Sequence, residues 1–428
     1  RGLISLIETN SSVVDALKSA KKIIAPSPAY PFLLASRAKE RPLLVVTSSS
    51  RGAEDLAHEL RELHSHVLEF PAWETLPHER LSPRSDTVAR RIATLNSLAN
   101  ATKENPIVIT PVRGMIHRFI ADISRVPLRT LEIGQELSLT DLVEHLTRNA
   151  YTRTDLVEKR GEFAVRGGIV DAFFPLAIHP IRIDFFGDEI EEMKYFDVAD
   201  QRTQEPVTEV IEILPCREFI LTPEVQARAA ALEEKFPSAS EILNKIATGI
   251  SCDGMESLIP MLVDELETIS ERMPEDCEVI FIDDERIKSR GADLIATNDE
   301  FFQAAWSSAS LGGDAPLPVE ATTYLDWDAL HEVISRCGLT IRSLNSFGSD
   351  LDTEATFLDF TPVEPMRGDS ERAIELLRQG LSENKSVIFS TSGHGMMERY
   401  AGIFRSADLP VHTLETLHAT PTKGMIYL

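Results

Sequence analysis

Hydrophobic and polar residues alternate through the stretch from Glu158 to Arg202, a pattern typical of half-buried β-strands. Gly187 and Asp188 interrupt the alternation, and a glycine at the first central position suits a type II′ hairpin turn. The pattern therefore predicts a small antiparallel sheet. Its strands are expected near residues 161–166, 168–174, 181–186 and 189–197.

The same alternation assigns side chains to the two faces of this sheet. If Ile183 and Phe185 face the core, then Arg182 and Phe186 face outward, and Arg166 on a neighbouring strand also faces outward. A large aromatic residue beside arginines on an exposed strand is typical of a protein-binding hot spot. In the alternative interpretation, Phe186 covers the hairpin turn or packs under another domain.

Residues 1–127 instead alternate short apolar runs with amphipathic segments, which predicts an α/β fold. Alternating strands and helices imply an open, doubly wound and mostly parallel sheet with helices on both faces. The strands are expected at 22–25, 42–47, 66–70 and 106–110, and the helices at 13–20, 31–39 and 52–63.

The antiparallel sheet is expected to form an insert domain over 128–213, which begins with a helix at 139–148 capped by Ser138. Helical patterns then dominate residues 214–345, with helices predicted at 223–235, 239–247 and 258–269. A strand at 278–283 and a helix at 286–306 predict that the chain returns to the first sheet. The insert would therefore divide one α/β domain into two halves, 1–127 and 214–345.

Residues 346–428 predict a second, small α/β domain. Strands are expected at 356–360, at 386–390 and near Val411. Helices are expected from Asp369 to Gly380 and from Met396 onward.

The loop after the first predicted strand is where a nucleotide phosphate would bind in such a sheet. Residues 25–31 read APSPAYP, with neither a glycine for close backbone approach nor a lysine for the phosphates. The prolines also remove N–H donors, and no GKS or GKT sequence occurs in the chain. We therefore expect no working ATP site.

Trp73 is expected to pack in a core, because stacking on DNA bases needs several aromatics among basic residues.

Composition narrows the possible partners. The 428 residues carry a formal net charge of −25, which opposes non-specific binding to nucleic acid phosphates. The four cysteines lack CxxC spacing, so we expect reduced, cytoplasmic thiols and no metal site. No apolar run is long enough to span a bilayer.

Because the chain begins at Arg1 and ends in an apolar run, we interpret it as part of a longer polypeptide. No catalytic constellation of the Ser-His-Asp, Cys-His or HExxH type is found.

Two stretches of the insert, GEFAVRGGIVDAFFP at 161–175 and IRIDFFGDEIEEMKYFDVADQRT at 181–203, resemble a sequence shared by excinuclease B and the bacterial transcription-repair coupling factors, Mfd. PAWETLPHERLSPRSDTVARRIATLNSLA at 71–99 and IVITPVRGMIHRF at 107–119 are similar to the coupling factors in particular. The resemblance is close over about the first 215 residues and looser beyond them. It implies a degenerate, helicase-like nucleotide-binding fold.

The resemblance also implies a function. A coupling factor's amino-terminal region is expected to bind excinuclease A without catalysis, by imitating excinuclease B, and to bring nucleotide excision repair to stalled RNA polymerase. The family's binding residues correspond to Arg166, Arg182 and Phe186. The region would also restrain the motor of the full-length ATP-dependent DNA translocase through an intramolecular contact with its carboxy-terminal part, whereas RNA polymerase and DNA would bind other segments. The alternative is an ATP-dependent, DNA-damage-processing enzyme of the excinuclease B type. No cofactor is expected.

Overall fold

The computed structural model describes residues 2–428 apart from 77–80, 101–103, 122, 124–127, 311–323, 350–351, 365–368, 392 and 418. Its chain contacts divide into two compact units. The first comprises Arg1–Arg41, His58–Ser65 and Arg342–Leu428, and the second comprises Pro42–Ala57 and His66–Ile341. Among the described residues, no helix has both the length and the apolar character that crossing a membrane requires.

Parallel strands form the centre of the second unit. β15 (Glu278–Ile282), β2 (Leu43–Thr47), β4 (Ile107–Pro111) and β3 (Val67–Glu69) lie side by side in that order. The pairing of β15 with β2 confirms that the chain returns to the sheet formed by its earlier segment. Strands β2 and β4 are buried at every position, because a parallel sheet covered on both faces needs continuous apolar runs.

Helices of this unit bury their apolar residues against these strands. Val88, Ile92 and Leu95 of α5 (Ser85–Ala99) join one core cluster with residues of β2, β4 and β15. Further helices that contribute to this cluster are α6 (Val112–Ile116), α11 (Asp284–Ser310) and α12 (Trp327–Arg336). Helix α4 is formed by Ser50–Arg61. The sequence pattern predicted neither α5 nor α12.

A second cluster of the unit contains the predicted helical region after the insert. Helices α8 (Pro223–Glu233) and α9 (Ser240–Ala247) confirm two predictions. The single helix predicted over 258–269 is wrong. Only α10 (Ile259–Leu262) forms, the backbone becomes extended at Val263, and β14 (Leu266–Glu267) then pairs with β5 (Phe119–Ile120). Trp73 is buried in this cluster, as predicted.

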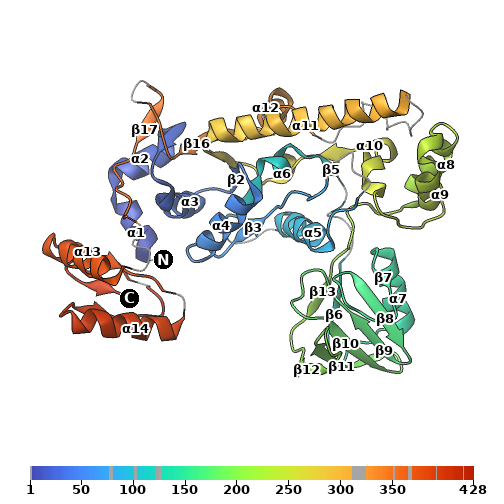
Figure 1. Cartoon of the computed structure of the whole chain (residues 1–428), viewed down its shortest axis with the longest axis horizontal. Helices are drawn as coiled ribbons and strands as arrows, with labels where there is room; N and C mark the ends of the chain where they lie inside the picture. Colours follow the sequence, from blue (N-terminus) through green and yellow to red (C-terminus); the bar gives the residue numbers. More distant parts are fainter. Residues whose placement is uncertain are drawn as a thin grey trace. The chain divides into compact units, whose positions relative to one another are not determined.

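The insert contains a six-stranded sheet in the order β12-β11-β10-β9-β8-β7 (Figure 1). Its strands are β7 (Thr152–Arg153), β8 (Glu162–Arg166), β9 (Ile169–Ala172), β10 (Ile181–Phe186), β11 (Glu189–Phe196) and β12 (Thr203–Pro206). The four predicted strands are confirmed to within two residues at each end. β6 (Arg129–Leu131) pairs separately with β13 (Ile211–Ile213). Helix α7 (Leu139–Arg148) is capped by Ser138, whose hydroxyl accepts a hydrogen bond from the Asp141 N–H, as predicted.

In the first unit, β1 (Lys22–Ile24) pairs in parallel with β17 (Ala355–Phe357) and β16 (Thr340–Asn345). Helices α1 (Gly2–Thr9), α2 (Ser11–Ser19) and α3 (Tyr30–Ala38) belong to the same unit. A short parallel sheet, β18 (Val387–Ile388), β20 (Ile426–Tyr427) and β19 (Val411–His412), carries α13 (Ser370–Ser382) and α14 (His394–Ser406). Helix α13 continues two residues beyond the end predicted at Gly380.

The predicted fold class is confirmed, because the chain combines parallel α/β structure with a separate antiparallel sheet. The domain boundaries near residues 127, 213 and 345 stay predictions.

Candidate partner-binding face

Strand register brings the three predicted binding residues to one face of the insert sheet. Arg182 of β10 lies opposite Asp171 of β9 on one side and Lys194 of β11 on the other. Phe186 lies four residues after Arg182 on the same strand, and Arg166 belongs to the next cross-strand row. Side chains alternate along strands, so these residues share one face of the sheet. We call this face, which carries Arg166, Asp171, Arg182, Phe186 and Lys194, the outer face.

Phe186 is the exposed apolar group of the outer face. Its side chain is 76% exposed, although it is the last residue of a regular strand. The preceding residue, Phe185, points to the opposite face and packs against the insert core. Phe186 pairs with Glu189 across a two-residue turn in which Gly187 has φ +64°, as the predicted type II′ turn requires.

Arg166 is the exposed cation of the outer face. It ends β8 and pairs with Ile169 across a second two-residue turn, where Gly167 has φ +63°. One of its guanidinium N–H groups donates a hydrogen bond to the backbone carbonyl of Asp155. This single backbone contact leaves further guanidinium donors for a partner.

Arg182 was expected to be solvated, but in the structure it is partly buried and paired with Asp171. Its Nε and Nη2 donate to the two carboxylate oxygens of Asp171 at 2.7 and 2.9 Å. The Arg182 side chain is 20% exposed and that of Asp171 only 3%. Its guanidinium also lies 5.1 Å from the centre of the Phe196 ring. The hydrogen bonds to Asp171 raise the pKa of Arg182, and they hold its guanidinium in position.

A small apolar cluster explains why Arg182 is partly buried. Val157, Ala164, Phe173 and Phe196 are buried together, separately from the main core of the insert. Phe173 follows β9 and Phe196 ends β11, the two strands beside β10, and Ala164 lies on β8 opposite Asp171. The outer face is therefore covered at one end and open at the end that carries Phe186 and Arg166. In the sequence, the large aromatic residues Phe173 and Phe196 at the ends of two predicted strands were the signal for this cluster. Strand alternation alone does not show that they pack together.

Strand geometry sets the size of this surface. Four residues along β10 separate Arg182 from Phe186 by roughly 13 Å, and two strand spacings separate Arg166 from β10 by roughly 10 Å. Glu189 and Glu192 lie on the same side, and Glu192 pairs with Lys194 at 2.6 Å. The surface can offer one aromatic side chain and one unshielded cation to a partner with an apolar pocket and a carboxylate.

The segment after β1, where a nucleotide phosphate would bind, does not form a glycine-rich phosphate-binding loop. After β1, residues Ser27–Ala29 form a 3-10 turn, and α3 follows directly with Pro31 in its first turn. Tyr30 is buried, and its hydroxyl hydrogen-bonds to the Ser346 hydroxyl at 2.8 Å. The described residues contain no group of three or more His, Cys, Asp or Glu side chains that could hold a metal ion.

Comparisons with known proteins decide the family. Residues 130–219, which include the outer face, match the family model described as the UvrB interaction domain. The transcription-repair-coupling factors of Mycobacterium bovis and Mycobacterium tuberculosis are each 36% identical to this chain over 429 aligned residues, covering 94% of this chain. In sequence, the chain belongs to the transcription-repair-coupling factor family.

Other members of the family agree with this assignment. The Haemophilus influenzae factor is 30% identical over 87% of this chain, and the Escherichia coli factor is 34% identical over 42% of it. The chain spans 34% of the length of the mycobacterial factors and 32% of the Haemophilus factor. The resemblance found in the sequence is thus confirmed for the region that the chain covers.

Proposed function

We propose that this part of a transcription-repair-coupling factor is a non-catalytic recruitment module. It binds excinuclease A through the outer face of its insert and thereby brings nucleotide excision repair to stalled RNA polymerase. The observation that supports this proposal most directly is the exposure of Phe186 within the segment that matches the UvrB interaction domain. A phenylalanine that is 76% exposed at the end of a regular strand contributes little to folding and much to docking.

Each residue of the outer face has a distinct part in the proposal. Phe186 enters an apolar pocket of excinuclease A, and Arg166 pairs with a carboxylate at the edge of the contact. Arg182 offers guanidinium N–H donors from a fixed position, because Asp171 holds and neutralises its guanidinium. The other residues of the outer face contribute shape complementarity to excinuclease A and exclude water from the contact.

Calorimetric titration of this chain against purified excinuclease A at fixed salt tests the proposal. The wild type should bind saturably, and Phe186→Ala should weaken binding by more than ~2 kcal/mol, about thirtyfold. Phe347→Ala is the matched control, because this phenylalanine is 90% exposed and belongs to the other unit. Absence of binding by the folded wild type, or equal loss in the control variant, would contradict the proposal.

The non-catalytic part of the proposal rests on the segment after β1. Its prolines and the buried Tyr30 occupy the position where a phosphate-binding loop would offer backbone N–H groups. We expect no ATP turnover by this chain at saturating ATP, with or without DNA. Turnover that co-purifies with the chain and changes in Tyr30→Ala would favour the enzymatic alternative.

The relatives are about three times as long as this chain, so the proposal assigns the remaining activities to other segments. The ATP-dependent DNA translocase, with its contacts to DNA and RNA polymerase, would lie outside this chain. An intramolecular contact with the carboxy-terminal part would restrain that motor. Deleting these 428 residues from the full-length protein should therefore raise its ATPase rate. An unchanged rate would remove this part of the proposal.

A further inference from the structure

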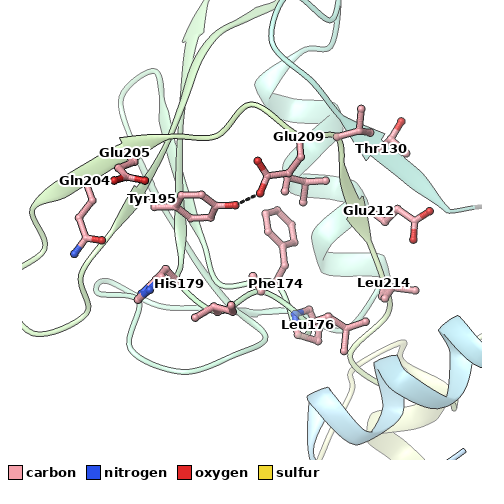
Figure 2. Close-up of a pocket in the computed structure, with 15 residues that line it drawn as sticks. Thr130, Phe174, Leu176, His179, Tyr195, Gln204, Glu205, Glu209, Glu212 and Leu214 are labelled. Atoms are coloured by element: carbon pink, nitrogen blue, oxygen red, sulfur yellow. Dashed lines mark hydrogen bonds between the residues drawn. The ribbon is translucent and has the colours of Figure 1, made fainter. Parts of the chain in front are cut away.

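A groove with a cavity volume of about 1020 Å³ lies at the margin of the insert core (Figure 2). It is lined by residues 174–179, which connect β9 to β10, and by Tyr195 of β11. Residues of β12, of the 209–210 segment and of β13 form another wall. Figure 2 shows Phe174 near its centre, with Glu205, Glu209 and Glu212 around it.

This groove and the outer face belong to opposite faces of the insert sheet. Tyr195 pairs with Ile181, and both side chains pack with the main insert core. Arg182 and Lys194 form the neighbouring cross-strand pair and therefore point to the other side. A molecule in the groove would leave Phe186 accessible.

The groove combines an apolar surface with negative charge. Leu176, Ile178 and Val210 are exposed at its edge, and Ile178 is 80% exposed. Such a group of large aliphatic side chains around a concave surface is typical of an interaction site. Three glutamates, Glu205, Glu209 and Glu212, line the same groove, and the described residues that line it include no lysine or arginine.

A hydrogen bond fixes one of these charges over the groove. The Tyr195 hydroxyl donates to the Glu209 carboxylate (Figure 2). Burial and this bond raise the pKa of Tyr195 to about 12, and the same bond lowers the pKa of Glu209. At neutral pH the tyrosine is therefore a hydrogen-bond donor and the glutamate a carboxylate held in one orientation.

We propose that this acidic groove is a docking site for a basic amphipathic segment of a partner protein. An aliphatic or aromatic side chain of the segment would enter between Phe174, Ile178 and Val210. Flanking lysines or arginines would face Glu205, Glu209 and Glu212. The three carboxylates disfavour nucleic acid and anionic lipid, and the net charge of −25 disfavours a second copy of this chain. The proposal is independent of excinuclease A binding.

Methyl NMR of the full chain, labelled at Ile, Leu and Val, tests the groove with a synthetic peptide, KRLLKKILRK. Titration should shift the methyl signals of Ile178 and Val210. Two matched peptides separate the contributions: EELLEEILEE reverses the charge, and KRSSKKSSRK removes the apolar anchors. Neither should shift these signals, and raising NaCl from 50 to 300 mM should weaken binding by the first peptide at least about threefold.

Variants complete the test. Ile178→Ser and Glu209→Gln should each weaken peptide binding at least about fivefold, and because both side chains are exposed the chain should stay folded. Phe186→Ala should leave it unchanged. Equal binding of the charge-reversed peptide, or shifts confined to other methyl groups, would overturn the proposal. So would a dimer, seen by sedimentation, that Ile178→Ser dissociates, since a second copy would then occupy the groove.

Discussion

Truncating Arg182 to alanine should destabilise the insert sheet as well as remove a cation from the outer face. The guanidinium makes two hydrogen bonds to Asp171, at 2.7 and 2.9 Å, across the β9–β10 pair. The Asp171 side chain is only 3% exposed. Without Arg182, this carboxylate would remain inside the sheet with its principal partner gone.

The expected cost follows from this burial. Removing one partner of a fully buried ion pair typically costs about 3–5 kcal/mol, mostly because the other charge is left uncompensated. Arg182 is 20% exposed, and its truncation admits water to Asp171. We therefore expect a loss of about 2–3 kcal/mol in the free energy of local opening.

Hydrogen exchange is the suitable assay, because it reports local opening of the insert sheet separately from unfolding of the rest of the chain. Amides that connect β9 with β10 report local opening directly. One of them is the Phe185 N–H, which donates to the Gly168 carbonyl at 2.9 Å. In Arg182→Ala these amides should exchange about 30- to 150-fold faster under conditions where exchange reports the opening equilibrium.

A double variant separates the ion pair from the binding role. Replacing both partners, Arg182→Met with Asp171→Leu, should restore most of the protection, since no charge is then left buried. Arg166→Ala, at an exposed position, should change protection by less than about 0.5 kcal/mol. Wild-type exchange in Arg182→Ala would refute the reasoning, as would a double variant no more protected than the single one. Excinuclease A binding should stay weakened in the double variant.

Four further outcomes are expected. Phe186→Ala should change the free energy of unfolding by less than about 0.5 kcal/mol, because its side chain is 76% exposed; a collapsed circular dichroism spectrum would instead support a structural role. Gly187→Ala should cost about 1–2 kcal/mol in hairpin exchange protection, because φ +64° strains any residue with a Cβ. Arg91→Met should cost about 3–5 kcal/mol in urea unfolding, because it leaves the buried Glu218 carboxylate without its ion pair. Burial, with Arg91 nearby, holds the pKa of His117 well below 6.5. The unfolded chain therefore binds the extra proton, and stability should fall as the pH drops below 6.5, by at most about 1.4 kcal/mol per pH unit; urea unfolding from pH 7.5 to 5 should show a shallower fall in His117→Phe.

Four of the six strands of the insert sheet, β8 to β11, were predictable because the sequence signals for them are local, whereas β7 and β12 were not predicted. Strand alternation and the turn at Gly187 specify which side chains share a face, and a register slip of one residue would bury Arg182 and Phe186. Observed strand ends differ from the predicted ones by no more than two residues. The alternation could not show that Arg182 pairs with Asp171, because that contact depends on which residue lies opposite on the neighbouring strand.

Helix α5 was missed for a different reason. Val88, Ile92 and Leu95 form a helical apolar stripe, but Arg91 lies among them and gives the segment a polar character. In the structure Arg91 is fully buried, with its guanidinium 4.0 Å from the Phe70 ring centre and paired with Glu218. A buried arginine requires a partner from elsewhere in the chain, here 127 residues away.

The helix predicted over 258–269 failed through long-range pairing. Its apolar spacing is compatible with a helix, yet Val263 takes an extended conformation and β14 pairs with β5. The partner strand lies near residue 120, about 145 positions earlier. Local patterns carry no information about such a partner, and tertiary pairing overrides helix propensity over a short segment.

The partly buried arginine and the exposed phenylalanine of the outer face support each other in the proposed function. Arg182 links β9 to β10 through Asp171, with Phe196 packed beneath it, and the last two residues of β10 pair with Ile190 and Glu189 of β11, so that Phe186 lies on a hydrogen-bonded strand and not on a loop. Phe186 then projects from a fixed backbone, with only its own side-chain torsions to be ordered on binding. A pre-organised aromatic side chain loses less conformational entropy on docking than one on a mobile loop. In the proposed function, the arginine that strand alternation placed in solvent would therefore contribute in two ways, through its guanidinium N–H donors and through the link it makes between β9 and the strand that carries Phe186.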